Sequence, residues 1–356
     1  MITKLLDCTL RDGGYVNDWN FGAENIRSII AMLTKANVDI VECGFLEDTS
    51  HSDSISIYNS MSKIKTFLPG ERGRTEYVAM IEYGKYPLDK LEVFDGGAVT
   101  GIRVTFHKND IENSLMFCAG IKEKGYKVYY QPVGIDAYKD REFLELVEKA
   151  NMLTPYSFYI VDTSGLMVEK DLQKIYHMLE SNLDASISIG FHSHNNLQLS
   201  FSNSQTFFNI YSNREKIIDS SVYGMGRGAG NLCTELMANY INNQKEIIYD
   251  VDCILEIYEY HIREIRKKFE WGYSIPLYLA ALHKCHPNYA IFLAEKALQT
   301  NEVKNILMSI LPERRCLFDY SYITALYLEH QNKQTGETNK DRPSQFSITG
   351  HTKSGV

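Results

Sequence analysis

Apolar residues in this chain gather into short runs that alternate with longer segments of helical period. Most of the short runs are almost continuously apolar, which is typical of parallel strands that are covered on both faces. In the segments between them, apolar residues recur every three or four positions, as at Ile26, Ile29, Ile30 and Leu33, which predicts amphipathic helices. The predicted strands are Ile2–Cys8, Val38–Phe45, Tyr77–Glu82, Gly101–Phe106, Lys127–Pro132, Ser157–Asp162, Ser186–His192 and Ile217–Tyr223.

The succession of strand and helix predicts an α/β fold. Eight such units within about 240 residues favour a closed (β/α)₈ TIM barrel. A doubly wound open sheet is the alternative, but it needs fewer strands and usually carries a glycine-rich phosphate turn after the first one. Here the first strand is followed by Asp12-Gly13-Gly14-Tyr15, which is not such a turn. We therefore expect the barrel.

The strand pattern ends near Asn243 and divides the chain into three parts. Residues 1–243 are predicted to form the barrel, and residues 244–331 read as several helices, which predicts a C-terminal helical module. Residues 332–356 contain only Phe346, Ile348 and Val356 as aliphatic or aromatic residues. Such a segment buries too little surface to offset its ordering entropy, so we expect a flexible tail.

Composition and charge exclude several classes of protein. Hydrophobic residues make up 44% of the 356 residues and charged residues 23%, as in a globular protein. The net charge of −8 argues against a general nucleic-acid binder, and no apolar run approaches the ~20 residues that span a membrane. Seven scattered cysteines and an N-terminus unlike a secretory signal indicate a reducing, cytoplasmic location.

Polar residues concentrate at the carboxyl ends of the predicted strands, where barrels of this kind place their catalytic groups. His192 and His194 are two residues apart at a strand end, so both imidazoles can reach one ion. Together with Asp12 they form a mixed nitrogen and oxygen set without thiolate, which suits Mn²⁺, Mg²⁺, Co²⁺ or catalytic Zn²⁺. Arg11 could bind a carboxylate or stabilise an enolate oxygen, or form an ordinary ion pair with Glu42 or Asp162.

Five motifs in this order resemble the metal-dependent lyases and synthases that include HMG-CoA lyase, 4-hydroxy-2-oxovalerate aldolase and isopropylmalate synthase (the DRE-TIM metallolyases). They span residues 7 to 235, nearly the whole predicted barrel. The motifs are Asp7-x-Thr9-Leu10-Arg11-Asp12-Gly13, Val41-Glu42-Cys43-Gly44, Asp162-Thr163-Ser164-Gly165, Gly190-Phe191-His192-Ser193-His194-Asn195-Asn196 with Asn203, and Gly224-Met225-Gly226-Arg227-Gly228-Ala229-Gly230-Asn231.

The resemblance implies roles for these residues. Asp12, His192 and His194 match the ligands of a divalent cation, with Mn²⁺ or Mg²⁺ favoured, and Asn231 matches a fourth ligand. Arg11 matches the arginine that steadies the enolate oxygen, and Glu42 an acidic residue with a supporting or acid/base role. The implied chemistry makes or cleaves a carbon–carbon bond of a 2-oxo acid through a metal-bound enolate. Among polar residues at the same strand ends, we expect substrate contacts from Gln131, Asp162, Asn196 and Arg227.

One position departs from the aldolases of this family. Where they carry a histidine that serves as general base, three residues after the metal aspartate, this chain has Tyr15. A phenol has a reference pKa of ~10, so it needs a nearby positive charge to take a proton at neutral pH. Tyr15 is therefore either the proton-transfer residue or a residue that shapes the pocket.

The motifs discriminate among four functions from different classes. An aldolase or lyase that acts on a 2-oxo acid and an aldehyde agrees best with the motifs. An acyl-CoA-dependent synthase would need a CoA pocket, and amidohydrolases place the His-x-His pair on the first strand. A non-catalytic scaffold would not need Arg11, Asp12, His192 and His194 together. We further expect a homo-oligomer, and the aldolase resemblance raises an aldehyde dehydrogenase as a partner for the helical module.

Overall fold

A parallel β-barrel forms the larger part of the molecule in a computed structural model, which describes residues 2–71, 73–135, 138–244, 246–315 and 318–335. Its strands pair in the order β1-β9-β8-β7-β6-β5-β4-β2, every pair is parallel, and β1 also pairs with β2 and closes the barrel. The bounds are β1 (Thr3–Asp7), β2 (Ile40–Leu46), β4 (Glu76–Glu82), β5 (Val99–Phe106), β6 (Lys127–Pro132), β7 (Ser157–Asp162), β8 (Ser188–Ser193) and β9 (Lys216–Ser220).

The expected TIM barrel is confirmed, and each of the eight predicted strands is present with its ends shifted by at most three residues. One short strand, β3 (Ile57–Tyr58), was not predicted; it pairs with β2 outside the barrel. Two residues give no apolar run long enough to signal a strand.

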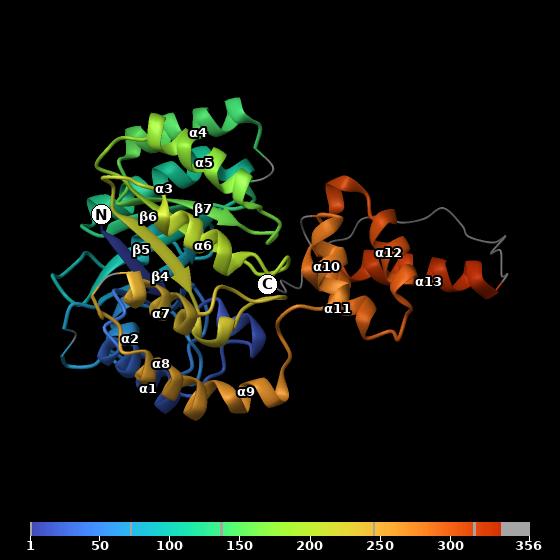
Figure 1. Cartoon of the computed structure of the whole chain (residues 1–356), viewed down its shortest axis with the longest axis horizontal. Helices are drawn as coiled ribbons and strands as arrows, with labels where there is room; N and C mark the ends of the chain where they lie inside the picture. Colours follow the sequence, from blue (N-terminus) through green and yellow to red (C-terminus); the bar gives the residue numbers. More distant parts are fainter. Residues whose placement is uncertain (1, 72, 136–137, 245, 316–317, 336–356) are drawn as a thin grey trace.

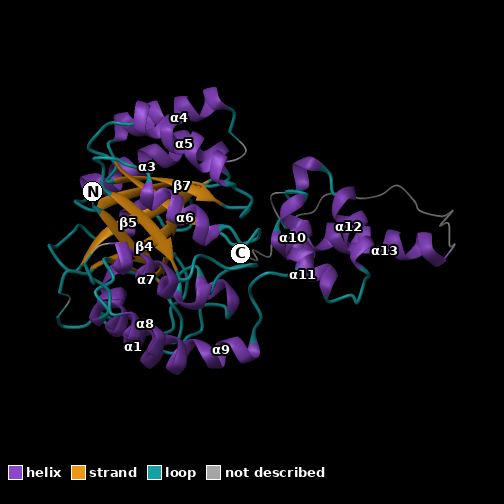
Figure 2. Cartoon of the chain, viewed as in Figure 1, coloured by secondary structure: helices purple, strands orange, loops and turns teal. Residues whose placement is uncertain are grey.

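Helices surround the barrel, as Figure 2 shows. Ile26, Ile29, Ile30 and Leu33 of α1 are all fully buried, as the periodicity predicted. The helices around the barrel are α1 (Ala23–Lys35), α2 (Met61–Lys65), α3 (Ile111–Glu123), α4 (Asp140–Leu153), α5 (Glu169–Asn182), α6 (Ser200–Asn209), α7 (Thr234–Gln244), α8 (Val251–Ile257) and α9 (Arg263–Lys268).

Alternate residues of each strand point into the barrel and out toward the helices. On β6, Tyr129 belongs to the apolar cluster inside the barrel, whereas Val128 and Tyr130 pack against the surrounding helices. The same alternation on β2, β5, β8 and β9 turns one set of polar side chains inward near the carboxyl ends. This alternation positions the candidate site.

A second hydrophobic core lies in the C-terminal helices, which extend to one side of the barrel (Figure 1). It is built around Tyr289, Leu293, Leu307 and Ile323. These helices are α10 (Ile275–Leu282), α11 (Pro287–Ala294), α12 (Thr300–Ser309) and α13 (Tyr320–Thr335). The several helices predicted for this part of the chain are present, and in α12 the buried Val303, Ile306 and Leu307 carry the helical spacing.

The division of the chain into domains stays a prediction. Ile254, Ile257, Ile262 and Trp271 pack in the core of the barrel rather than in that of the helical module, which favours a boundary after Trp271 over one at Asn243. Of the predicted tail, residues 332–335 lie in α13, and residues 336–356 lie outside the described part of the chain.

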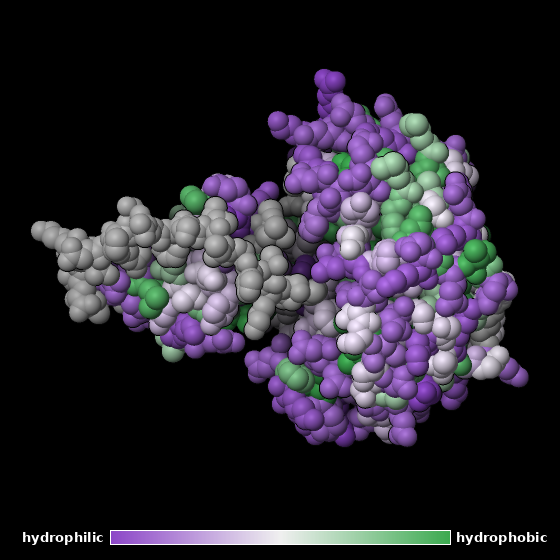
Figure 3. All heavy atoms as spheres, turned by 180° about the vertical axis from the view of Figure 1, so that it is seen from behind, coloured by the Kyte–Doolittle hydropathy of each residue, from purple (hydrophilic) through white to green (hydrophobic). Residues whose placement is uncertain are grey.

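The surface of the barrel is mainly hydrophilic when the molecule is seen from behind, with small hydrophobic patches between polar ones (Figure 3). Among the described residues, no helix is both long and apolar enough to cross a membrane.

Candidate metal centre

Three side chains at the carboxyl ends of the strands converge in the barrel. Asp12 follows β1, His192 is in β8, and His194 comes directly after β8. One potential ligand atom from each lies within 4.8 Å of the other two, and all three residues are buried. The two imidazole rings are perpendicular, with centroids 5.2 Å apart. The three residues that the sequence predicted as metal ligands are therefore close together in the structure.

The charge states of these groups suit a cation. Burial raises the pKa of Asp12, but Arg11, the two histidines and a hydrogen bond from Asn231 together outweigh burial, and the pKa lies well below its usual value. Burial lowers the pKa of His194 to about 3, so its imidazole is neutral at pH 7. The site thus presents a carboxylate and neutral imidazole, the forms that bind metal ions.

Asn231 Oδ1, beside the triad, and His194 Nδ1, within it, are buried and have no hydrogen-bond partner among the described residues. Asn231 Nδ2 donates to Asp12 Oδ2 over 2.5 Å and to the Met225 carbonyl over 3.2 Å, which holds the amide against the triad. A Cβ at Gly226 would lie 2.3 Å from Asn231 Nδ2 and 2.9 Å from Asp12 Oδ2, so only glycine fits there. Asn231 Oδ1 is buried and unpaired, so it could serve as a fourth metal ligand. The residues of the site therefore fit a cation.

The ion pair with Glu42 that the sequence allowed for Arg11 is present, and Arg11 also pairs with Asp12, which was not predicted. Its Nε donates to Glu42 Oε2 over 2.8 Å, and its Nη1 donates to Asp12 Oδ1 over 2.7 Å. No hydrogen bond ties Nη2 to the described residues. This nitrogen is therefore available for an oxygen atom bound next to Asp12.

Two residues that the sequence reasoning missed complete the surroundings of the triad. Asp219, on β9, accepts a hydrogen bond from His192 Nδ1 over 3.0 Å. Arg103, on β5, is fully buried and forms ion pairs with Asp219 and with Glu42. A charged residue within an otherwise apolar predicted strand was the available signal, because such a residue is buried only when it is paired.

Tyr15 lies on the short 3₁₀ helix Gly13–Val16 that follows Asp12. Its ring packs edge-on against Trp19 and Phe45, with centroids 4.7 and 6.1 Å away, and the Arg227 guanidinium is 5.4 Å from its centroid. Burial raises the pKa of Tyr15 to about 12, although the charge of Arg227 lowers it. In this state the phenol keeps its proton at neutral pH.

Charged groups near Tyr15 line the mouth of the barrel. Arg227 is half-buried, and its guanidinium has neither a hydrogen bond nor an ion pair with the described residues. Its charge also contributes to the low pKa of His194, after burial. Asp12 and Glu82, the last residue of β4, are carboxylates whose charges, in addition to burial, raise the pKa of Tyr15. Glu82 was not among the predicted site residues; its place in the last position of a strand was the signal.

Three further predicted substrate residues hold the scaffold together. In the orientation that satisfies its amide, Gln131 Oε1 accepts from Arg103 Nη2 over 2.8 Å. Asp162 points outward, and its carboxylate accepts from the backbone N–H groups of Leu166 and Met167 over 3.1 and 3.2 Å. Asn196 Nδ2 donates to the Ser164 carbonyl over 2.8 Å. Their contact with substrate stays a prediction.

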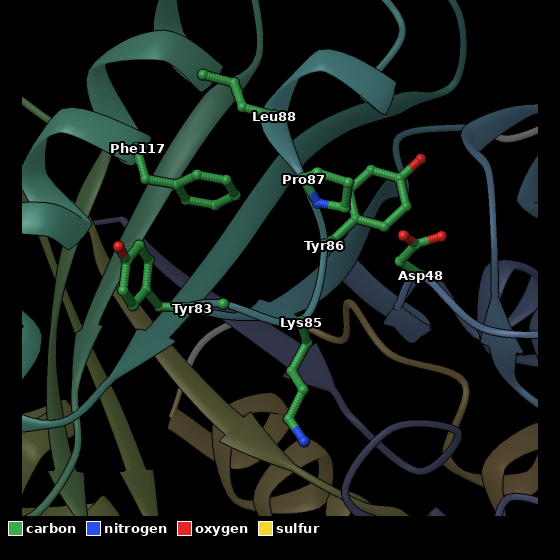
Figure 4. Close-up of a pocket in the computed structure, with 8 residues that line it drawn as sticks. Asp48, Tyr83, Lys85, Tyr86, Pro87, Leu88 and Phe117 are labelled. Carbon is green, nitrogen blue, oxygen red and sulfur yellow. The ribbon is translucent and has the colours of Figure 1, made fainter.

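Two cavities are lined by residues other than the triad. One, of about 380 Å³, is lined by Asp48, Tyr83, Lys85 and Phe117 among others, and Figure 4 shows its aromatic wall. The other, of about 390 Å³, lies at the end of β7 and includes Asp162 and, from the helical module, Lys284. None of Asp12, His192 and His194 lines either cavity.

Among proteins of known sequence, this chain is similar to enzymes named 4-hydroxy-2-oxovalerate aldolase. The Thermomicrobium roseum protein is 28% identical over 257 residues, which cover 66% of this chain and 65% of that protein. This chain thus spans less than two thirds of that relative. A Geobacillus genomosp. 3 protein of the same name is 26% identical over 72% of this chain and 76% of its own. A Mycobacterium tuberculosis protein named oxaloacetate decarboxylase is 24% identical, over 71% of this chain and 74% of that one.

Solved structures share the fold. The N-terminal domain of a candidate aldolase from Bacteroides vulgatus superposes with a TM-score of 0.69 at 23% identity, over 83% of this chain and 97% of that one. The HMG-CoA lyase from Brucella melitensis gives a TM-score of 0.57 at 12% identity, over 75% and 99%. A sequence profile of the HMGL-like family matches residues 3–266, which span the whole barrel from β1 to the helices that pack on it. The chain therefore belongs to the HMGL-like family.

Proposed function

We propose that this protein is a divalent-metal-dependent carbon–carbon lyase, an aldolase that releases or uses the enolate of a 2-oxo acid. The observation that carries the proposal is the position of Arg11: its Nη1 bonds metal-ligand candidate Asp12 over 2.7 Å, so its free Nη2 lies beside the same triad. A guanidinium there can donate to an oxygen on which negative charge develops.

The proposed metal ligands are Asp12, His192 and His194, with Asn231 Oδ1 as the fourth. Two imidazoles with carboxylate and amide oxygens favour Mn²⁺ or Mg²⁺, and Co²⁺ and Zn²⁺ are further candidates. A cation in this position supplies Lewis-acid polarisation of the 2-oxo group.

The residues of the chain divide the remaining work. Arg11 stabilises the enolate oxygen, and Glu42 holds Arg11 in position by accepting a hydrogen bond from Arg11 Nε. Arg227, without an ion-pair partner among the described residues, anchors a carboxylate of the substrate at the mouth of the barrel. Tyr15 closes the pocket next to Arg227 and, with a pKa near 12, serves as a hydrogen-bond donor rather than as a base.

The names of the relatives support a common donor. Retro-aldol cleavage of 4-hydroxy-2-oxovalerate and decarboxylation of oxaloacetate both leave the enolate of pyruvate. We therefore infer pyruvate enolate as the shared species, with an aldehyde as the second reactant in the aldol direction. The aldehyde itself, a homo-oligomeric state and an aldehyde dehydrogenase partner stay predictions.

Exchange of the pyruvate methyl protons with solvent D₂O tests this function, because it reports enolate formation and needs no aldehyde. We expect NMR to show exchange with Mn²⁺ or Mg²⁺ present and its loss after chelation. Pyruvate release from a panel of 4-hydroxy-2-oxo acids and from oxaloacetate then identifies the reaction. Metal-loaded protein that neither exchanges pyruvate nor cleaves any member of the panel would contradict the proposal.

A further inference from the structure

A continuous chain of alternating charges crosses the interior of the barrel below the triad. At one end, Arg11 Nη1 donates to Asp12 and Arg11 Nε donates to Glu42 Oε2, over 2.7 and 2.8 Å. Arg103 Nη1 donates to the same Glu42 oxygen over 2.7 Å. The groups in order are Asp12, Arg11, Glu42, Arg103, Asp219 and His192.

The far end of this chain reaches the second metal-ligand candidate. Arg103 Nη2 donates to Asp219 Oδ2, and the same oxygen accepts from His192 Nδ1 over 3.0 Å. A proton on Nδ1 leaves the Nε2 lone pair of His192 for a metal ion, because a neutral imidazole carries only one proton. Asp219 thus selects the tautomer of His192 that can bind.

Arg103 is held in one position from four sides. Besides the two carboxylates, the amide of Gln131 accepts from it, and the Tyr159 ring lies 4.8 Å below its guanidinium. Arg103 and Glu42 are both fully buried, so water cannot replace a lost contact. A lysine has no planar fork and can satisfy the two carboxylates only with one flexible ammonium group.

We propose that Arg103 is a positioning residue that couples the orientation of His192, through Asp219, to that of Arg11, through Glu42. It touches neither metal nor substrate, and one side chain sets the geometry of both halves of the site. This inference rests on the proposed metal site, and it adds that the site depends on a residue that contributes no ligand.

Metal affinity tests the inference apart from catalysis. Mn²⁺ binding, followed by the EPR signal of the free ion, is to be measured for the wild type and for Arg103→Lys and Asp219→Asn. Loss of a group that orients a metal-binding histidine typically weakens binding 10–100-fold, and we expect a loss of this size in both variants. The visible spectrum of the Co²⁺-substituted protein should change as well, because the ligand geometry is altered.

Arg214→Lys is the matched control. Arg214 is also buried and also donates a fork of hydrogen bonds, but to the backbone carbonyls of Leu183 and Ile187 and away from the triad. It should lose stability without a change in Mn²⁺ affinity or Co²⁺ spectrum.

The outcomes separate this inference from the proposed function. Wild-type protein that binds no Mn²⁺ would contradict the proposed function. Normal Mn²⁺ binding by the wild type, with affinity within twofold and an unchanged Co²⁺ spectrum in folded Arg103→Lys, would overturn the role of Arg103 alone. If Arg103→Lys does not fold, Asp219→Asn decides in the same way, because it removes only the charge and keeps the shape.

Discussion

Trp19 occupies the space that a side chain at Gly14 would need. A Cβ on Gly14 would lie 1.9 Å from Trp19 Cδ1, and Trp19 Nε1 donates to the Arg11 carbonyl over 2.7 Å. The indole therefore holds the backbone of the loop that carries Arg11 and Asp12. Any side chain at position 14 would collide with the indole, so this packing requires glycine there.

Gly14→Ala should displace Trp19 and loosen this loop. We expect a loss of about 1–3 kcal/mol in the free energy of unfolding from the forced repacking, together with weaker metal binding. Urea unfolding and tryptophan fluorescence measure the two effects. Gly70→Ala is the control, since a Cβ there meets no atom within 4 Å; equal behaviour of the two variants would show that the indole does not hold the loop.

The double variant His192→Ala/His194→Ala should lose its stoichiometric metal, because it removes two of the four proposed ligands. Elemental analysis after gel filtration in Mn²⁺ measures this. The matched control, His107→Ala/His177→Ala, changes two exposed histidines and should keep full metal content. Metal content at the wild-type level in the first variant would show that the ligands lie elsewhere.

Arg11→Lys should keep the metal but lower turnover. A lysine ammonium cannot bond Glu42, Asp12 and a developing oxyanion in one plane, and loss of such a donor typically costs ~10²–10³ in rate. Steady-state kinetics at saturating metal measures the change in kcat. Near-normal turnover would leave Arg11 with a structural role only.

Tyr15→Phe should preserve the fold and the metal content and slow pyruvate proton exchange only modestly. The reason is that burial raises the pKa of this phenol to about 12, so it is not the base at neutral pH. Deuterium incorporation into pyruvate, followed by NMR, gives the rate. Complete loss of exchange in the folded, metal-loaded variant would instead assign proton transfer to Tyr15.

The raised pKa of buried Asp7 should make the stability of the protein fall as the pH rises. Burial raises its pKa from 3.8 to about 6, although Thr234 and Thr9 donate hydrogen bonds to it. The folded state therefore holds the proton more tightly than the unfolded chain, and raising the pH from 4 to 6 costs stability, by about 3 kcal/mol at ~1.4 kcal/mol per pKa unit. Above pH 6 this cost is constant.

Asp7→Asn should remove this contribution. Its free energy of unfolding, measured in urea at pH 4.5 and 7.5, should gain relative to the wild type as the pH rises. Glu148→Gln, an exposed change on α4, should leave the pH dependence as in the wild type. A parallel pH dependence in wild type and Asp7→Asn would mean that Asp7 titrates normally.

Local sequence determined the barrel and the core of its candidate metal centre. Continuous apolar runs mark strands that are buried on both faces, and the ends of parallel strands meet at one rim. His192 and His194 share a face because side chains alternate along a strand, so their convergence with Asp12 followed from spacing and fold class alone.

Tertiary structure decided what surrounds that centre. Arg103 meets Glu42 and Asp219 across 61 and 116 residues of sequence, and no local pattern pairs residues at such separations. Side chains alternate along β7, so a shift of one residue decides whether Asp162 points into the barrel or out of it. In the structure it points outward, and its carboxylate caps the following turn instead of facing the triad. A charged side chain inside a barrel takes its role from the partners that the closed sheet brings to it, and those partners exist only once the barrel has closed.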